Sequence, residues 1–92
     1  MTQLPGGWQD ADIRSSRVHE AALFACRHTF GARFVSYIMI YAEQQVVAGM
    51  NYNIILNVST RNAENGNNII EHQRRFVVND HFGQYSVIQQ ST

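Results

Sequence analysis

The sequence predicts an α+β fold in which one N-terminal α-helix packs across a twisted, four- to five-stranded antiparallel β-sheet. Three observations lead to this prediction. Apolar residues recur at helical spacing in one segment near the start, and after about residue 34 they recur at every second residue. Short groups of turn-forming residues then divide this second part into hairpins. A chain of 92 residues, 45% of them apolar, is expected to form a single domain of residues 1–92.

The helix is expected from Asp12 to about Thr29, after a flexible N-terminal trunk of residues 1–11. Asp12 and Ser15 are alternative N-caps, and Gly31 stands where a helix would end. The stripe that faces the core is expected to consist mostly of small side chains: Val18, Ala21, Ala22, Ala25, Cys26 and Thr29. Small side chains let the helix lie close to a sheet.

Four strands are expected to follow, at residues 34–47, 50–60, 69–78 and 85–90. A turn at residues 61–68 contains Asn65-Gly66, and a break at residues 79–83 separates the last two strands. The second strand alternates most clearly, with a dry face and a wet face. The dry face holds Tyr52, Ile54, Leu56 and Val58, and the wet face holds Asn51, Asn53, Asn57 and Ser59.

Charge and cysteine content exclude several classes of protein. Seven Arg balance seven Asp plus Glu, so a net charge of zero provides no field to attract nucleic acid or an anionic membrane. The single cysteine, Cys26, excludes an internal disulfide framework. The first residues lack the basic and apolar regions of a signal peptide. These features predict a cytoplasmic protein, with a mature secreted form as the alternative.

No arrangement of residues indicates catalysis, a metal site or a cofactor. Cys26 and His28 lie on different sides of the predicted helix, so they cannot act as nucleophile and base. His72 and His81 are close enough in the sequence to approach each other across a hairpin, but no third ligand accompanies them. The sequence therefore predicts a protein that is not an enzyme and that needs no cofactor or metal.

The connection between the first two strands is unusual for a turn. Gln45-Val46-Val47-Ala48-Gly49 stands where the first hairpin must reverse, yet turns favour Asn, Asp, Gly or Ser. Two β-branched residues there imply backbone strain and exposed apolar surface, with Gly49 free to take a positive φ. The alternative is that the turn lies elsewhere and the valines belong to an ordinary strand. Physical reasoning alone leaves both interpretations open.

These five residues match the Q-x-V-x-G signature of cystatins, reversible inhibitors of papain-like cysteine proteases. Asn51-Tyr52 continues the match, and Gly6-Gly7 resembles the glycine of the family's N-terminal trunk. Phe24-Ala25 resembles a further, weaker family pattern. The order of helix and strands also agrees, so the resemblance covers essentially the whole chain. Without disulfides or a leader, the chain resembles the stefin-type or phytocystatin-like members.

The resemblance implies a tight-binding, competitive inhibitor of papain-like, cathepsin-type proteases that blocks the active-site cleft. Leu4-Pro5 would follow the unprimed side of the cleft, and Gly6-Gly7 would turn the chain away from the catalytic cysteine. His81-Phe82 stands where many cystatins carry Pro-Trp, which leaves a non-inhibitory protein-binding module on the same fold as the alternative. A monomer with an accessible domain-swapped dimer is expected. The implied protease-binding residues are Leu4, Pro5, Gly6, Gly7, Gln45, Val46, Val47, Ala48, Gly49, His81 and Phe82.

Overall fold

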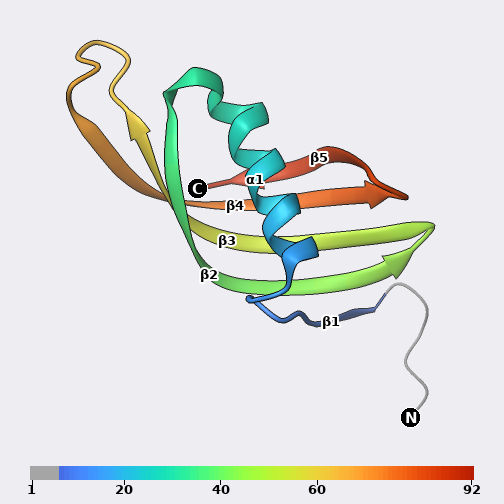
Figure 1. Ribbon diagram of the computed structural model, residues 1–92. Coiled ribbons are helices and arrows are strands. Elements are labelled where there is room, and N and C mark those ends of the chain that lie inside the picture. The colour runs from blue at the N-terminus through green and yellow to red at the C-terminus, as the bar shows by residue number, and fades with distance from the viewer. Residues whose placement is uncertain (1–6) are drawn as a thin grey trace.

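The computed structural model describes residues 7–92, in which one helix lies across one face of a five-stranded antiparallel sheet (Figure 1). The strands follow the order β1-β2-β3-β4-β5. A short 3₁₀ turn, η1, connects the helix to β2. The elements are β1 (Trp8–Asp10), α1 (Ser16–Phe30), η1 (Gly31–Arg33), β2 (Phe34–Val47), β3 (Gly49–Arg61), β4 (Ile69–His81) and β5 (Gln84–Ser91). The predicted fold class is confirmed.

The helix α1 meets the sheet through its small-residue stripe, as the periodicity predicts. Five predicted members of the stripe are buried, and Phe30 joins them at the end of the helix: Val18, Ala21, Ala22, Ala25, Cys26 and Phe30. They pack on the dry face of β3 and on Phe76 and Val78 of β4. Because the stripe is small, the helix can lie close to the sheet, and this contact forms the core.

The helix begins at Ser16, later than the predicted Asp12, because residues 12–15 form a turn of their own. The backbone N–H of Ser15 donates to the carbonyl of Asp12 at 3.0 Å, and the Arg14 N–H donates to the Asp12 carboxylate at 2.9 Å. Gly31 ends α1 with a φ of +56°. The Asp12 carboxylate therefore caps the turn that leads into α1.

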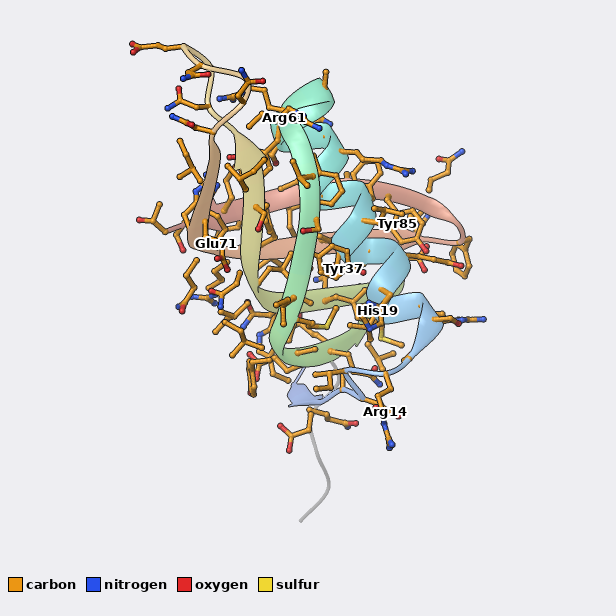
Figure 2. All side chains as sticks on the ribbon, turned by 60° about the vertical axis from the view of Figure 1, so that its left-hand side comes forward. Arg14, His19, Tyr37, Arg61, Glu71 and Tyr85 are labelled. Atoms are coloured by element: carbon orange, nitrogen blue, oxygen red, sulfur yellow. The ribbon has the colours of Figure 1, made fainter. Side chains whose placement is uncertain are left out.

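A half-buried histidine contact holds the start of α1 to the sheet. His19 of α1 and Tyr37 of β2 point toward each other in Figure 2, and His19 Nδ1 lies 2.6 Å from the Tyr37 hydroxyl. The other ring nitrogen, Nε2, donates to the carbonyl of Ile13 at 2.6 Å. His19 thus joins the turn, the helix and β2.

The predicted trunk of residues 1–11 is wrong for residues 8–10, which form β1. Trp8 pairs with Gln45, and Asp10 pairs with Glu43, along the edge of β2. The Ala11 N–H then donates to the Ala42 carbonyl at 3.1 Å. Three residues are too few to show a period in the sequence, and their order comes from the unpaired backbone groups of β2. Residues 1–6 of the predicted trunk lie outside the described part of the chain.

The wet face of β3 also differs from the prediction at one residue. Asn53 is only 5% exposed, and both polar atoms of its side chain form hydrogen bonds. Its Nδ2 donates to the Glu43 carboxylate at 2.7 Å, and its Oδ1 accepts from Arg75 Nε at 2.8 Å. A strand between two partners buries polar side chains that bond one another, which alternation along one strand cannot reveal.

The two ends of the sheet carry different connections (Figure 1). The hairpin end has the β2–β3 turn and the β4–β5 turn, which are residues 46–49 and 81–83, with the start of β1 beside them. The loop end has residues 62–68, which join β3 to β4. The predicted break at residues 79–83 is shorter than expected, because β4 continues to His81.

Candidate functional site

The first hairpin turns where the unusual pentapeptide stands. Val47 pairs with Gly49, so Ala48 alone forms the tip between β2 and β3. Val46 is 56% exposed and Val47 is 39% exposed, on a bend rather than beneath the helix. Each of the two interpretations that the sequence left open is therefore correct in part: the chain reverses within the pentapeptide, but both valines are strand residues of β2 beside the turn.

Gly49 is required in this hairpin for two separate reasons. Its φ of +100° is a backbone conformation that residues with a β-carbon rarely adopt. A β-carbon would also collide with the backbone carbonyl oxygen of Asp80 in the neighbouring hairpin. The two turns are consequently in direct backbone contact, and this contact depends on the glycine.

The second hairpin presents an aromatic side chain at its tip. Phe82 is 80% exposed and has a φ of +52°, and Gly83 follows with +94°. Two successive positive φ values describe a type I′ turn, in which Asn and Gly are the usual residues. The Asp80 carboxylate closes the turn by accepting the Gly83 N–H at 2.7 Å. The left-handed conformation costs Phe82 about 1–2 kcal/mol.

Backbone strain lies in a different hairpin from the one expected. Within residues 7–92, Phe82 is the one non-glycine residue with a positive φ. Val46 and Val47 lie in regular β2 and expose apolar surface without such strain. The strain predicted at the two valines is therefore wrong, because Gly49 absorbs the reversal and the cost falls on Phe82.

His81 connects the two hairpins. Its Nδ1–H donates to the carbonyl of Ala48, the tip of the first hairpin, at 3.1 Å. The His81 ring also meets the Phe82 ring edge to face, with centroids 4.9 Å apart. His81 therefore fixes the spacing of the two tips, a role that the sequence did not reveal.

A row of amides fixes the same spacing from the sheet face opposite the helix. Asn79 of β4 donates to Asn51 of β3 at 2.8 Å, and Asn51 donates to Gln45 of β2 at 2.9 Å. Gln45 is predicted as a protease-binding residue, yet its Oε1 accepts a hydrogen bond from Asn51 within the sheet. The row joins β2, β3 and β4, which are three of the four strands that end in the two turns.

Of the N-terminal residues of the predicted site, Gly7 lies in the described part of the chain. Gly7 precedes Trp8, and Trp8 pairs with Gln45, so the chain enters the sheet beside the first hairpin. Trp8 is 38% exposed at this end and is a surface residue that the sequence analysis did not select. The predicted residues Leu4, Pro5 and Gly6 lie outside the described residues.

The described residues 7–92 form no arrangement typical of a catalytic or metal-binding site. Cys26 is buried, and burial raises the pKa of its thiol to about 12, so it is not a nucleophile at neutral pH. His72 of β4 packs against Phe30 of α1, far along β4 from His81, so the two imidazoles do not meet. Across residues 7–92, no three His, Cys, Asp or Glu side chains gather as metal ligands.

No helix in this part of the chain is long and apolar enough to cross a membrane.

Comparisons with known proteins agree with the geometry. No protein-family model matches the sequence. L-cystatin of Tachypleus tridentatus is 32% identical over 83 residues, which cover 85% of this chain and 62% of that protein. Cystatin-2 of Ornithodoros moubata is 39% identical over 61 residues, which cover 63% of this chain and 48% of that protein. This chain thus spans about half to three-fifths of the length of these relatives.

The solved structures include a match over nearly the whole chain. The salivary cystatin of the soft tick Ornithodoros moubata superposes with a TM-score of 0.71 at 25% identity. The match covers 96% of this chain and 97% of that one.

The predicted cytoplasmic location is wrong. The matched structure is that of a salivary protein, and the relatives point to an extracellular location. The prediction rested on the first residues and on a lone cysteine, and neither feature reports the compartment of a chain shorter than its relatives. The stefin-type or phytocystatin-like subtype stays a prediction.

The signature hairpin, the order of the strands, two sequence relatives and one superposable structure all indicate the same family. This chain belongs to the cystatin superfamily, a family of inhibitors and not of enzymes.

Proposed function

We propose that this chain is a reversible, tight-binding, competitive inhibitor of papain-like, cathepsin-type cysteine proteases. One observation carries the proposal. Val46, Val47 and Phe82 are exposed apolar residues on two turns that lie side by side at the hairpin end. A monomeric protein has no folding reason to place such residues there, so they favour a binding surface.

The mode of inhibition follows from the shape of this end. Two neighbouring tight turns form a narrow ridge that fits a cleft, and neither turn presents an extended peptide bond for cleavage. Val46, Val47 and Ala48 would pack against one wall, and Phe82 would contact the primed side. Leu4-Pro5 would occupy the unprimed side, and Gly6-Gly7 would lead the chain away from the catalytic cysteine into β1.

The binding free energy would come mainly from apolar burial. Fully burying a Val or Phe side chain contributes about 1.5–3 kcal/mol, and nanomolar affinity corresponds to about −12 kcal/mol. The two tips are already held together by His81 and by the amide row, so little conformational entropy is lost on docking. A net charge of zero further predicts that affinity changes little with salt.

A titration of papain with this chain tests the proposal. We expect inhibition that substrate relieves by competition, that dilution reverses, and that leaves the chain intact by mass. Binding without loss of protease activity would contradict inhibition and would favour the non-inhibitory module. Cleavage of the chain at the hairpin end would identify it as a substrate instead.

A monomer that can convert to a domain-swapped dimer is part of the same proposal. Exchange would straighten the β2–β3 turn at Ala48 and Gly49 and remove that tip from the hairpin end. Size-exclusion chromatography after partial unfolding is expected to show a dimer that no longer inhibits papain. A chain that stays monomeric under these conditions would contradict this part of the proposal.

A further inference from the structure

The loop end contains a peptide bond whose chemistry the binding function does not use. We propose that Asn65 deamidates spontaneously in the folded chain, through attack by the backbone nitrogen of Gly66 and with solvent water as the only co-reactant. Both residues are exposed in the loop of residues 62–68, beside Arg61 (Figure 2). This inference does not rest on the proposed function.

The loop is ordered by its own backbone and amide groups. The Asn62 N–H donates to the Asn68 carbonyl at 2.9 Å, which closes the loop at its base. The Asn68 N–H donates to the Asn65 carbonyl at 3.0 Å, which forms a β-turn around Gly66. Asn65 therefore occupies the first position of a defined turn and not an arbitrary point on a loose chain.

The turn folds the Asn65 side chain back over the next peptide. Asn65 Oδ1 accepts the backbone N–H of Asn67 at 3.1 Å, two residues further on. This bond closes an Asx turn, so the Asn65 carboxamide is folded back along the segment that contains the Gly66 nitrogen. The same bond polarises the side-chain carbonyl and stabilises the negative charge that develops on its oxygen during attack.

The attacking nitrogen is unhindered. A β-carbon built on Gly66 would meet no atom within 4 Å, so the side of this residue from which a side chain would project is open. No group within residues 7–92 accepts the Gly66 N–H, whereas the Gly66 carbonyl accepts from Arg61 Nη1 at 3.4 Å. Water can therefore remove the amide proton as the nitrogen approaches the Asn65 side chain.

The reaction balances with water alone. The Gly66 nitrogen loses its proton to solvent and bonds to Asn65 Cγ, and the bond from Cγ to the side-chain nitrogen breaks. The side-chain nitrogen takes up a proton and leaves as ammonia, and a five-membered succinimide remains. Water then adds to either ring carbonyl and opens the ring to aspartate or isoaspartate.

The other seven Asn residues lack the combination of a folded-back side chain and a following glycine. None precedes a glycine, so the following nitrogen always carries the hindrance of a side chain. Asn51, Asn53 and Asn79 also have side chains bound between strands. Asn65 is thus the residue at which the chain is expected to change first.

The product alters charge and backbone at one end only. A new carboxylate takes the net charge from zero to one negative charge at neutral pH. Isoaspartate adds a backbone carbon to the turn and so removes the bond from Asn68 to Asn65. The hairpin end lies at the opposite end of the sheet, so its geometry is unchanged (Figure 1).

Incubation of the folded chain in mildly alkaline buffer, followed by trypsin, tests the inference. Cleavage after Arg61 and Arg74 releases a peptide that contains Asn65, and mass spectrometry locates any new acid. We expect aspartate and isoaspartate at residue 65 before any other Asn changes. The matched control is Gly66→Ala, which the open space tolerates and which is expected to react about tenfold more slowly.

A second comparison separates the native state from the unfolded chain. The excised tryptic peptide is incubated beside the folded protein, and we expect the two rates to agree within about tenfold. Conversion in the peptide alone, an equal rate in Gly66→Ala, or earlier loss of a strand Asn would each overturn the inference.

Discussion

The loop end and the hairpin end of the sheet reverse the chain with different kinds of residue. At the loop end, Asn62 and Asn65 accept backbone N–H groups of their own loop, and no apolar side chain is needed. At the hairpin end, Val46, Val47 and Phe82 stand exposed on tight turns. Strands of this sheet can therefore be connected by polar residues alone, so chain reversal does not account for the exposed apolar residues at the hairpin end. This contrast supports the proposed binding surface.

The two ends also differ in how they are held. Among the described residues 7–92, the loop of residues 62–68 is held by bonds within residues 61–68. The two turns of the hairpin end are joined through His81 and Ala48 and through the close approach of Gly49 to Asp80. The loop end is thus held by its own bonds, whereas the hairpin end consists of two turns that hold each other in place. The following variants test this difference, from the largest expected effect to the smallest.

Gly49→Val is expected to weaken papain binding by on the order of a hundredfold, equivalent to about 2.7 kcal/mol. The positive φ and the collision with Asp80 force the two turns apart. We expect the free energy of unfolding to fall by about 1–3 kcal/mol while α1 stays folded. Inhibition kinetics and circular dichroism measure the two effects.

The matched control is Gly66→Val at the loop end, where a side chain has open space. We expect neither affinity nor stability to change appreciably. Helix loss in parallel with the loss of inhibition in Gly49→Val would show a general unfolding rather than a local displacement.

Deleting residues 1–7 is expected to raise the dissociation constant about tenfold, equivalent to about 1.4 kcal/mol, with an unchanged melting temperature. Deleting residues 1–10 should lower the melting temperature as well, because β1 no longer pairs with β2. Calorimetry and papain titration distinguish the two deletions. Unchanged inhibition after the shorter deletion would show that the glycine resemblance of the trunk is accidental.

Phe82→Gly is expected to change stability and binding in opposite directions. Glycine relieves the left-handed conformation at residue 82, so the free energy of unfolding should rise by about 0.5–1 kcal/mol. Losing the aromatic contact should weaken binding by several-fold. The control is Gly83→Ala, which introduces a β-carbon at positive φ and should destabilise the fold. A simultaneous loss of stability in Phe82→Gly would contradict the assigned strain.

His81→Leu is expected to have the smallest effect, a loss of affinity of a few-fold. The bond from His81 to Ala48 is exposed, and a typical hydrogen bond contributes about 0.5–1.5 kcal/mol. His81→Asn can still donate to the Ala48 carbonyl and should restore most of the affinity. Equal losses in both variants would indicate that the imidazole contacts the protease directly.

Much of this architecture could be predicted because it depends on local periodicity. The stripe of α1 and the dry face of β3 are regular patterns, and the structure buries both. The turn around Ala48 was harder, because two valines are compatible with a bend and with a strand. Asn53 and β1 were not predictable, since their order depends on neighbours that lie far away in sequence.

The sequence by itself determined one helix, the principal strands and an apolar first turn, because each of these follows from the spacing of side chains along the chain. Only the tertiary structure decided that His81 joins the two turns, that Phe82 carries the strained φ, and that Trp8 enters the sheet beside Gln45. The physical reason is that backbone pairing between strands sets the distance between the turns, and this pairing joins segments that lie far apart in the sequence.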